Sequence, residues 1–162
     1  MCGIFGYSGT KNCKDEIFNG LKRLEYRGYD SWGIAILNEK KVTQYKNIGE
    51  VKKDKALAKL NDGAVGIGHT RWATHGGVTV INAHPHFSTN KSFTLVHNGM
   101  VENYNSLKKD LLKKKKKFKS QTDTEVIVKL IEEELKKEKI FKEAVKSAFK
   151  RLKGRNTIAI LE

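Results

Sequence analysis

The stretch Met1-Cys2-Gly3-Ile4-Phe5-Gly6 sets the interpretation of the rest of this 162-residue sequence. Because cysteine is small, Met1 is a candidate for enzymatic removal, which would leave Cys2 with both a thiol and a free α-amine. A thiol of pKa ~8.5 is only partly ionised at neutral pH, and an α-amine of pKa ~8 can take its proton and later return it to a leaving group. Cys2 can therefore serve as nucleophile and general base together. The alternative is a strand that begins with a buried cysteine.

Length and composition predict one globular domain with a sizeable core. Apolar residues make up 38% of the chain, and no stretch approaches the ~20 apolar residues of a membrane span. No basic region and apolar core typical of a signal peptide begins the sequence, so we expect a cytoplasmic protein without membrane contact. The two cysteines, Cys2 and Cys13, form no metal-ligand spacing and no disulfide framework.

The charge balance is strongly basic, with 32 Lys and Arg against 18 Asp and Glu. Much of the excess lies in lysine runs such as Lys113–Lys117 and Lys136-Lys137. Sites for single-stranded nucleic acid interleave basic and aromatic residues, whereas the longer run is followed by Phe118 alone. We interpret the run as a solvated lysine face. A non-catalytic, lysine-rich nucleic-acid-binding module remains the rival class of function.

Apolar spacing predicts strands first and helices later. The expected strands cover 2–8, 33–37, 42–45, 64–68, 93–97 and 156–161; the expected helices cover 15–26, 51–60, 102–116, a segment opened by Thr122 and Glu125 as a capping box, and a segment through Ala144, Ala148 and Leu152. Without regular alternation of strand and helix, this order favours an α+β fold with helices on the outer faces of sheets.

All five histidines lie between His69 and His97, so a metal site has to be considered. His84-Pro85-His86 can place two imidazoles on one side of an extended segment. The span holds no Asp, Glu or Cys, however, and any zinc site would need histidines alone or ligands from elsewhere. We therefore predict no metal and no cofactor.

Two other segments suggest binding of a polar ligand. His69 to Gly77 is expected to be a mobile loop in which Arg71 grips a carboxylate, Thr74 and His75 add hydrogen bonds, and Trp72 excludes water. An ordinary surface loop with a stacked Arg-Trp pair is the alternative.

Asn98-Gly99, at the end of a predicted strand, is suited to an oxyanion hole, although Asn-Gly is also common in tight turns. Asp123 can receive a ligand ammonium group, although Asp is favoured in any first helical turn. Together these groups describe a site for an α-amino acid whose side-chain amide is attacked by Cys2.

Six motifs in order give the chain a resemblance to a known family. They are Cys2-Gly3-Ile4, Glu25-Tyr26-Arg27-Gly28-Tyr29-Asp30-Ser31, His69 to Gly76, Asn82-Ala83-His84-Pro85-His86, His97-Asn98-Gly99 and Thr122-Asp123-Thr124-Glu125. The sequence resembles the N-terminal glutaminase domains of glutamine–fructose-6-phosphate aminotransferases. The glutaminase domain of another amidotransferase, such as amidophosphoribosyltransferase, shares the Cys start and Asn-Gly and remains an alternative.

The resemblance implies a four-layer αββα sandwich of the N-terminal-nucleophile hydrolase type over 2–162. It implies hydrolysis of L-glutamine through a Cys2 thioester, the ammonia-donating half of glucosamine-6-phosphate synthesis. The implied catalytic residues are Cys2, Asn98, Gly99 and Arg27; the implied substrate-binding residues are Arg71, Trp72, Thr74, His75, Gly99 and Asp123.

Three departures from the family pattern accompany this resemblance. Trp32 replaces a small residue, which puts the packing near the Arg27 loop in doubt. Gly77-Val78-Thr79 lacks a proline, so the loop is expected to close differently. We also expect a C-terminally incomplete domain, without the sugar-phosphate isomerase part that handles fructose 6-phosphate.

The run 156–161 is apolar and, on this expectation, has nothing after it to cover or pair with it. An unpaired apolar edge is a template for association. We predict a weakly active, marginally stable or aggregation-prone chain whose sheet is completed by a homo-oligomer or a partner chain. Thermal unfolding with light scattering, with and without glutamine, tests this. A monomer with a sharp transition above ~65 °C would show that the chain is self-sufficient.

Overall fold

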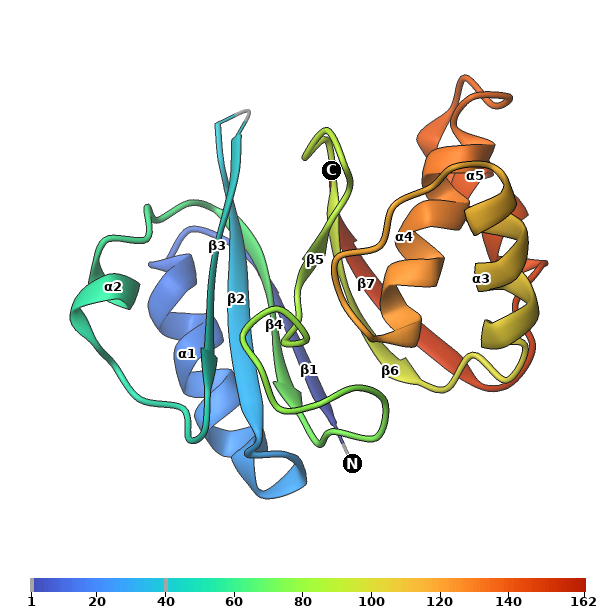
Figure 1. Cartoon of the computed structure of the whole chain (residues 1–162). Helices are drawn as coiled ribbons and strands as arrows, with labels where there is room; N and C mark the ends of the chain where they lie inside the picture. The colour runs from blue at the N-terminus through green and yellow to red at the C-terminus, as the bar shows by residue number, and fades with distance from the viewer. Residues whose placement is uncertain (1, 40) are drawn as a thin grey trace.

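The computed structural model describes residues 2–39 and 41–162, and these residues form four layers (Figure 1). Two antiparallel sheets lie face to face in the middle. One outer face is covered by α1 (Cys13–Leu24) and α2 (Lys55–Ala58), and the other by α3 (Tyr104–Lys113), α4 (Asp123–Glu134) and α5 (Phe141–Phe149). The α+β class and the αββα layer order are confirmed.

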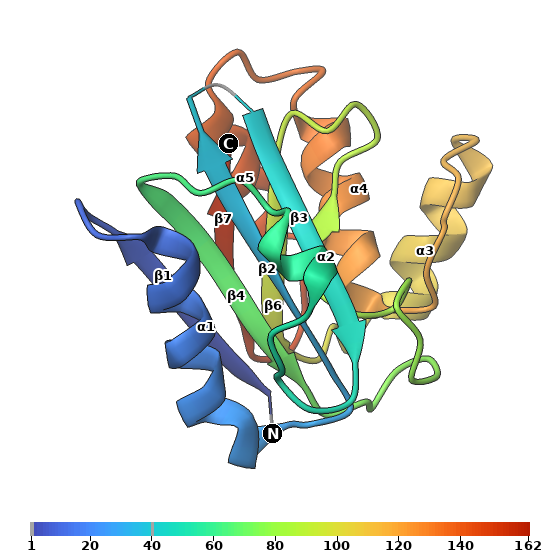
Figure 2. The ribbon, with the colours of Figure 1, turned by 90° about the vertical axis from the view of Figure 1, so that its left-hand side faces the viewer.

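Strand β4 is the centre of the first sheet. The strands of this sheet, in the order β1-β4-β2-β3, are β1 (Gly3–Ser8), β4 (Val65–Arg71), β2 (Ser31–Asn38) and β3 (Lys41–Ile48). The second sheet runs β5 (His86–Phe87), β6 (Thr94–Gly99) and β7 (Asn156–Leu161). Figure 2 shows β6 and β7 stacked behind β2 and β4. Among the described residues β7 pairs with β6 alone, so it is an edge strand. That this edge makes the chain prone to aggregation stays a prediction.

Three apolar clusters hold the layers together because side chains alternate between the two faces of each strand. On β2, Ile34 and Ile36 pack with α1, whereas Ala35 between them joins the cluster between the sheets. On β6, Leu95 packs under α4 and Val96 faces the first sheet. This alternation therefore fixes which face of each sheet meets the other.

Helix α1 approaches β4 closely because β4 carries glycine where the helix crosses it. A Cβ atom at Gly68 would lie 2.5 Å from Ile17 Cγ2, and one at Gly66 would lie 2.5 Å from Ile17 Cδ1. Such distances do not occur between real side chains, so a larger residue would push the helix off the sheet. The close packing fixes the strand that leads into the functional site.

Several predicted boundaries were wrong. The helix expected over 51–60 is only the short helix α2, which begins after Asp54. The Asp54 carboxylate caps this helix by accepting a hydrogen bond from Leu57 N at 2.7 Å. The strand expected over 64–68 continues as β4 to Arg71. Strand β5, with two residues, was not predicted. None of the described helices has the length and apolar character that crossing a membrane requires.

The predicted capping box is also wrong. Thr122 precedes α4, but its side chain does not cap the helix. Glu125 instead turns back to the preceding loop, where it accepts hydrogen bonds from the backbone N–H groups of Lys119 (2.9 Å) and Ser120 (2.6 Å). The Thr122 hydroxyl lies 3.2 Å from His86 Nε2 and so links the loop to the second sheet.

Trp32, a departure from the family pattern, is part of the core. Its side chain is fully buried, with its ring edge-on to Phe18 at 6.0 Å and tilted against Tyr45 at 5.2 Å. The indole Nε1–H donates to Glu50 O at 3.0 Å, which satisfies its one polar atom. The bulky residue is therefore accommodated between α1 and the first sheet.

We predict that Trp32→Ala lowers the free energy of unfolding by about 3–5 kcal/mol, because it leaves a large cavity and an unpaired Glu50 carbonyl. Trp72→Ala is the matched control. Trp72 is 45% exposed, and we expect a loss below about 1 kcal/mol. Urea denaturation followed by far-UV circular dichroism measures both. Equal losses would mean that Trp32 is not a core residue.

Candidate active site

Cys2 lies at the end of β1, where the pairing of β1 with β4 brings it beside Trp72. Its Sγ accepts a hydrogen bond from Trp72 N at 3.3 Å and lies 3.6 Å from Trp72 O. The Nε–H of Arg27 donates to Cys2 O at 3.4 Å. The thiol is partly exposed, so it is accessible to a ligand. Met1 lies outside the described residues, and its removal stays a prediction.

Asn98 reaches Cys2 from the second sheet. Its Nδ2 donates to Cys2 O at 3.1 Å, and its Oδ1 accepts from His69 Nε2 at 2.9 Å. The next residue, Gly99, has a φ of +133°, and a Cβ atom there would lie 2.1 Å from Arg155 O. Only glycine fits this position. The structure thus brings together the predicted nucleophile and the predicted Asn-Gly pair, although the two are 96 residues apart.

His69 was not predicted as a site residue in its own right. It is fully buried on β4, and its Nε2 faces two oxygen acceptors, Asn98 Oδ1 at 2.9 Å and His97 O at 3.0 Å. Because both oxygens only accept, the proton of the neutral ring sits on Nε2. His69 therefore orients the Asn98 amide so that its NH₂ group faces Cys2.

Three further histidines continue from His69 into the second sheet. The rings of His69 and His84 lie 4.1 Å apart, those of His84 and His86 lie 4.9 Å apart, and the Thr124 hydroxyl joins His84 Nε2 (2.7 Å) to His97 Nδ1 (3.0 Å). Burial lowers the pKa of all four, to about 3 for His69, so the rings are neutral at pH 7. Within the described residues, no group of three or more His, Cys, Asp or Glu side chains is placed to hold a metal ion.

The first third of the segment predicted as a loop, His69 to Gly77, is strand. His69, Thr70 and Arg71 belong to β4, and the loop begins at Trp72. Arg71 is 3% exposed, and its guanidinium donates to the carbonyl groups of His75, Gly76 (3.3 Å) and Gly77 (3.1 Å). Its burial lowers its pKa, and three acidic groups nearby (Cys2, Asp30 and Asp123) oppose that shift.

The other predicted ligand contacts surround this arginine. The Trp72 ring leans edge-on to Tyr29 at 5.6 Å, the His75 ring meets Tyr104 at 5.0 Å, and Thr74 is exposed. Asp123, the first residue of α4, accepts from Val101 N at 2.9 Å through Oδ2, while its Oδ1 accepts no hydrogen bond from the described part of the chain. One carboxylate oxygen thus remains available for a ligand.

Comparisons with known proteins agree with this geometry. A family model described as a glutamine amidotransferase domain matches residues 42–144. The chain belongs to this family. It is 48% identical to the glutamine–fructose-6-phosphate aminotransferase [isomerizing] of Bacillus thuringiensis subsp. konkukian over the whole of this chain and 27% of that protein. The enzyme of the same name from Pyrococcus horikoshii is also 48% identical, over 99% of this chain and 27% of that one.

Solved structures show the same fold for this glutamine amidotransferase domain. The glutamine phosphoribosylpyrophosphate amidotransferase from B. subtilis matches with a TM-score of 0.85 at 29% identity, over 99% of this chain and 35% of that chain. The domain is therefore an N-terminal-nucleophile αββα sandwich. This 29% identity is lower than the 48% identity to the fructose-6-phosphate aminotransferases. The alternative of an amidophosphoribosyltransferase glutaminase domain is therefore less favoured. The chain spans about a quarter of the length of those curated relatives.

The buried histidines generate a pH prediction. In the unfolded chain a histidine has a pKa near 6.5, whereas folded His69 has one of about 3, so the unfolded state binds protons first as pH falls. The stability that the neutral rings contribute is present above pH ~6.5 and is lost toward pH 3. Within that window His69 alone removes up to about 1.4 kcal/mol per pH unit.

We expect urea denaturation at pH 7.5, 6.0 and 5.0 to give a falling free energy of unfolding. His84→Gln should lower stability at pH 7.5 but flatten the dependence on pH, because one buried titratable ring is gone. Equal stability of the unsubstituted chain at pH 7.5 and 5.0 would contradict the neutral histidine cluster.

Proposed function

We propose that this domain hydrolyses the side-chain amide of L-glutamine to glutamate and ammonia. The observation that carries the proposal is the meeting of Cys2 and Asn98 across the two sheets, with the Asn98 amide 3.1 Å from Cys2 O. A reactive thiol and an amide donor at one point fit attack on a carbonyl carbon whose oxygen becomes negative. His69 keeps the donor hydrogens of Asn98 on the reacting side.

The reaction proceeds through a thioester on Cys2. After removal of Met1, the free α-amine takes the thiol proton as Sγ attacks the amide carbon. Asn98 Nδ2 and Gly99 N–H stabilise the oxyanion, and the C–N bond breaks as the amine returns the proton to the departing nitrogen, which leaves as ammonia. Water then attacks the thioester, with the amine as base, and releases glutamate and the free thiol.

The surrounding residues fit the amino-acid end of glutamine. Arg71 is the partner for the α-carboxylate and Asp123 Oδ1 the partner for the α-ammonium, and opposite charges at two points fix the orientation of the substrate. Thr74 and His75 add hydrogen bonds from the loop, Trp72 covers the thiol, and Arg27 holds the Cys2 carbonyl. All these roles are part of the proposal.

The wider role follows from the relatives. Proteins named as glutamine–fructose-6-phosphate aminotransferases are about four times as long as the matched segment. We propose that ammonia from this domain is used, in the cytoplasm, to convert fructose 6-phosphate to glucosamine 6-phosphate by a sugar-phosphate isomerase part. That part acts in the same polypeptide or in a partner chain.

The two cysteines provide the decisive experiment. We expect Cys2→Ala to lower glutamate production by roughly a thousandfold or more while glutamine binding, measured by calorimetry, is largely kept. Cys13→Ala is the matched control. Cys13 is fully buried and its pKa is raised to about 11, chiefly by desolvation, so this variant should retain turnover.

Intact mass spectrometry of each variant first establishes that Met1 has been removed. Undiminished glutamate production by Cys2→Ala would end the proposal. Equal loss of activity in both variants, with folded spectra, would place the reacting group elsewhere.

A further inference from the structure

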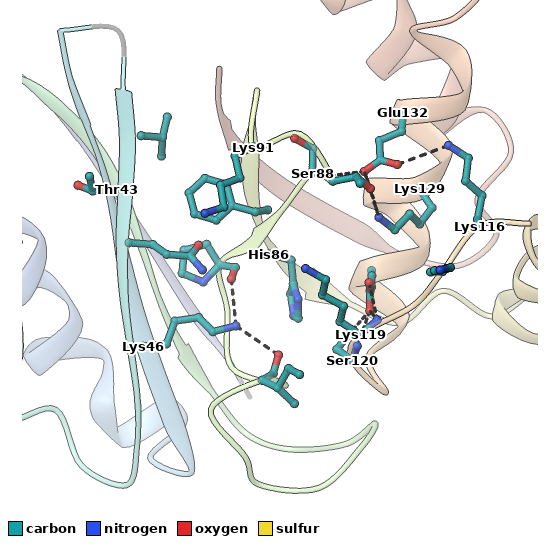
Figure 3. A pocket seen from close by; sticks show the side chains of 18 of the residues that line it. Thr43, Lys46, His86, Ser88, Lys91, Lys116, Lys119, Ser120, Lys129 and Glu132 are labelled. Atoms are coloured by element: carbon teal, nitrogen blue, oxygen red, sulfur yellow. Dashed lines mark hydrogen bonds and ion pairs between the residues drawn. The ribbon is translucent and has the colours of Figure 1, made fainter.

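A cavity of about 900 Å³ lies away from Cys2, at the edge of the sandwich formed by β3 and β5. One wall is strand β3, the opposite wall is α4 with the loop before it, and the segment 85–89 lies between them (Figure 3). None of the proposed catalytic or glutamine-binding residues lines it. Its volume is within the range of about 300–1,000 Å³ that small-molecule sites occupy.

The lining is unusually basic. Among the described residues, it contains eight lysines and two glutamates: Lys41, Lys46, Lys91, Lys115, Lys116, Lys117, Lys119 and Lys129, with Glu125 and Glu132. The lysines come from four separate segments of the chain, so no single helix face or lysine run accounts for them. Their charges converge from three sides on one space.

Both glutamates already have partners. Glu132 lies 3.1 Å from the buried ammonium of Lys129 and 3.5 Å from that of Lys116, and it accepts from Thr89 N at 2.6 Å. Glu125 is occupied by backbone N–H groups of the loop before α4. Within the described part of the chain, the ammonium groups of Lys91, Lys115, Lys117 and Lys119 form no ion pair. These four lysines are exposed residues, so their unpaired positive charge surrounds the opening of the cavity.

The ammonium group of Lys46, on the β3 wall, is partly removed from water. Among the described residues, its ammonium donates to two neutral carbonyl groups alone, Ile81 O at 3.2 Å and Pro85 O at 3.4 Å. Burial lowers its pKa to about 8, against a smaller opposing effect of Glu125. Figure 3 shows Lys46 and Lys119 extending from opposite walls with His86 between them. An anion between these walls would attract both ammonium groups and would favour the charged form of Lys46.

The polar groups indicate which anion fits. Lysine ammonium groups act as point charges toward phosphate, and Ser88, Thr89 and Ser120 add hydroxyl donors beside them. No arginine lines the cavity, so planar bidentate recognition of a single carboxylate is not favoured. Of the described residues that line it, only Phe87 and His86 have aromatic rings, too few for the successive stacking that single-stranded nucleic acid needs.

We propose that this lysine-lined cavity binds a small ligand carrying two or more linked phosphate groups. Several phosphates in a chain can reach lysines on facing walls, whereas one phosphate cannot neutralise both. The linked phosphates can belong to an inorganic polyphosphate or to a nucleotide, and the experiment distinguishes the two.

Isothermal titration with sodium tripolyphosphate at 50 and 150 mM salt provides the test. We expect saturable 1:1 binding that weakens with salt and exceeds the affinity for orthophosphate or sulfate by at least roughly tenfold. ATP that binds more tightly than tripolyphosphate would identify the nucleotide, and equal affinities would identify the phosphate chain alone; either supports the site.

The cavity variant is Lys46→Gln with Lys119→Gln, and its matched control is Lys142→Gln with Lys150→Gln on and just beyond α5, which removes the same charge elsewhere. The cavity variant should weaken tripolyphosphate binding about tenfold, and the control less than about twofold. Lys119→Gln alone, whose ammonium has no partner to lose, decides the matter if the double variant does not fold.

Three outcomes would overturn the proposal. Equal weakening in both double variants would show a general effect of net charge. Orthophosphate binding as tightly as tripolyphosphate, or no saturable binding, would remove the linked-phosphate requirement or the site. A single-stranded RNA that binds more tightly than tripolyphosphate and is lost in the cavity variant would make it a nucleic-acid surface.

Discussion

The hydrogen bond from His69 Nε2 to Asn98 Oδ1 joins the two sheets at the point where the chemistry is proposed. Cys2 and His69 belong to the first sheet side of the sandwich, and Asn98 belongs to the second. The site therefore exists only while the sheets keep their spacing and their relative register. A shift of either sheet by a small fraction of a strand repeat would separate the nucleophile from its amide donor.

The rest of the fold maintains that spacing. β4 is paired on both edges, and α1 rests directly on its glycines, so the strand that carries His69 and Arg71 has little freedom to move. Between the sheets, small and medium side chains such as Ala35 and Val96 allow close approach. The buried histidines have a cost, because their rings must stay neutral and two of their nitrogens, Nδ1 of His69 and of His84, lack hydrogen-bond partners in the described chain.

The sequence allowed much of this architecture to be predicted, because local patterns are strong. The apolar runs at 33–37 and 93–97 and the helical spacing in α1 and α4 located those elements to within a few residues. Cys2, Asn98 and Gly99 carry chemistry that is recognisable without neighbours. The resemblance to a known family then predicted that these residues form one site.

Other features depend on contacts between distant segments and have no local signature. His69 orients Asn98 only because β4 lies opposite β6. Glu125 binds the loop before it, although its spacing from Thr122 matches a capping box, because His86 and Ser120 engage the Thr122 hydroxyl. Strand β5 is too short to show a period. The lysines of the cavity come from four segments, and in the sequence alone they cannot be told apart from ordinary solvated lysines.

The burial of Cys13 has a practical consequence for work on this domain. Cys13 is the first residue of α1, and its thiol is buried between this helix and the first sheet and is kept protonated, whereas Cys2 is partly open to solvent. A thiol-directed alkylating reagent applied to the folded protein therefore has one accessible target. The mass increment of the labelled chain gives the number of accessible thiols. A ligand that covers Cys2 would slow this labelling, so its occupancy can be measured as protection of the thiol.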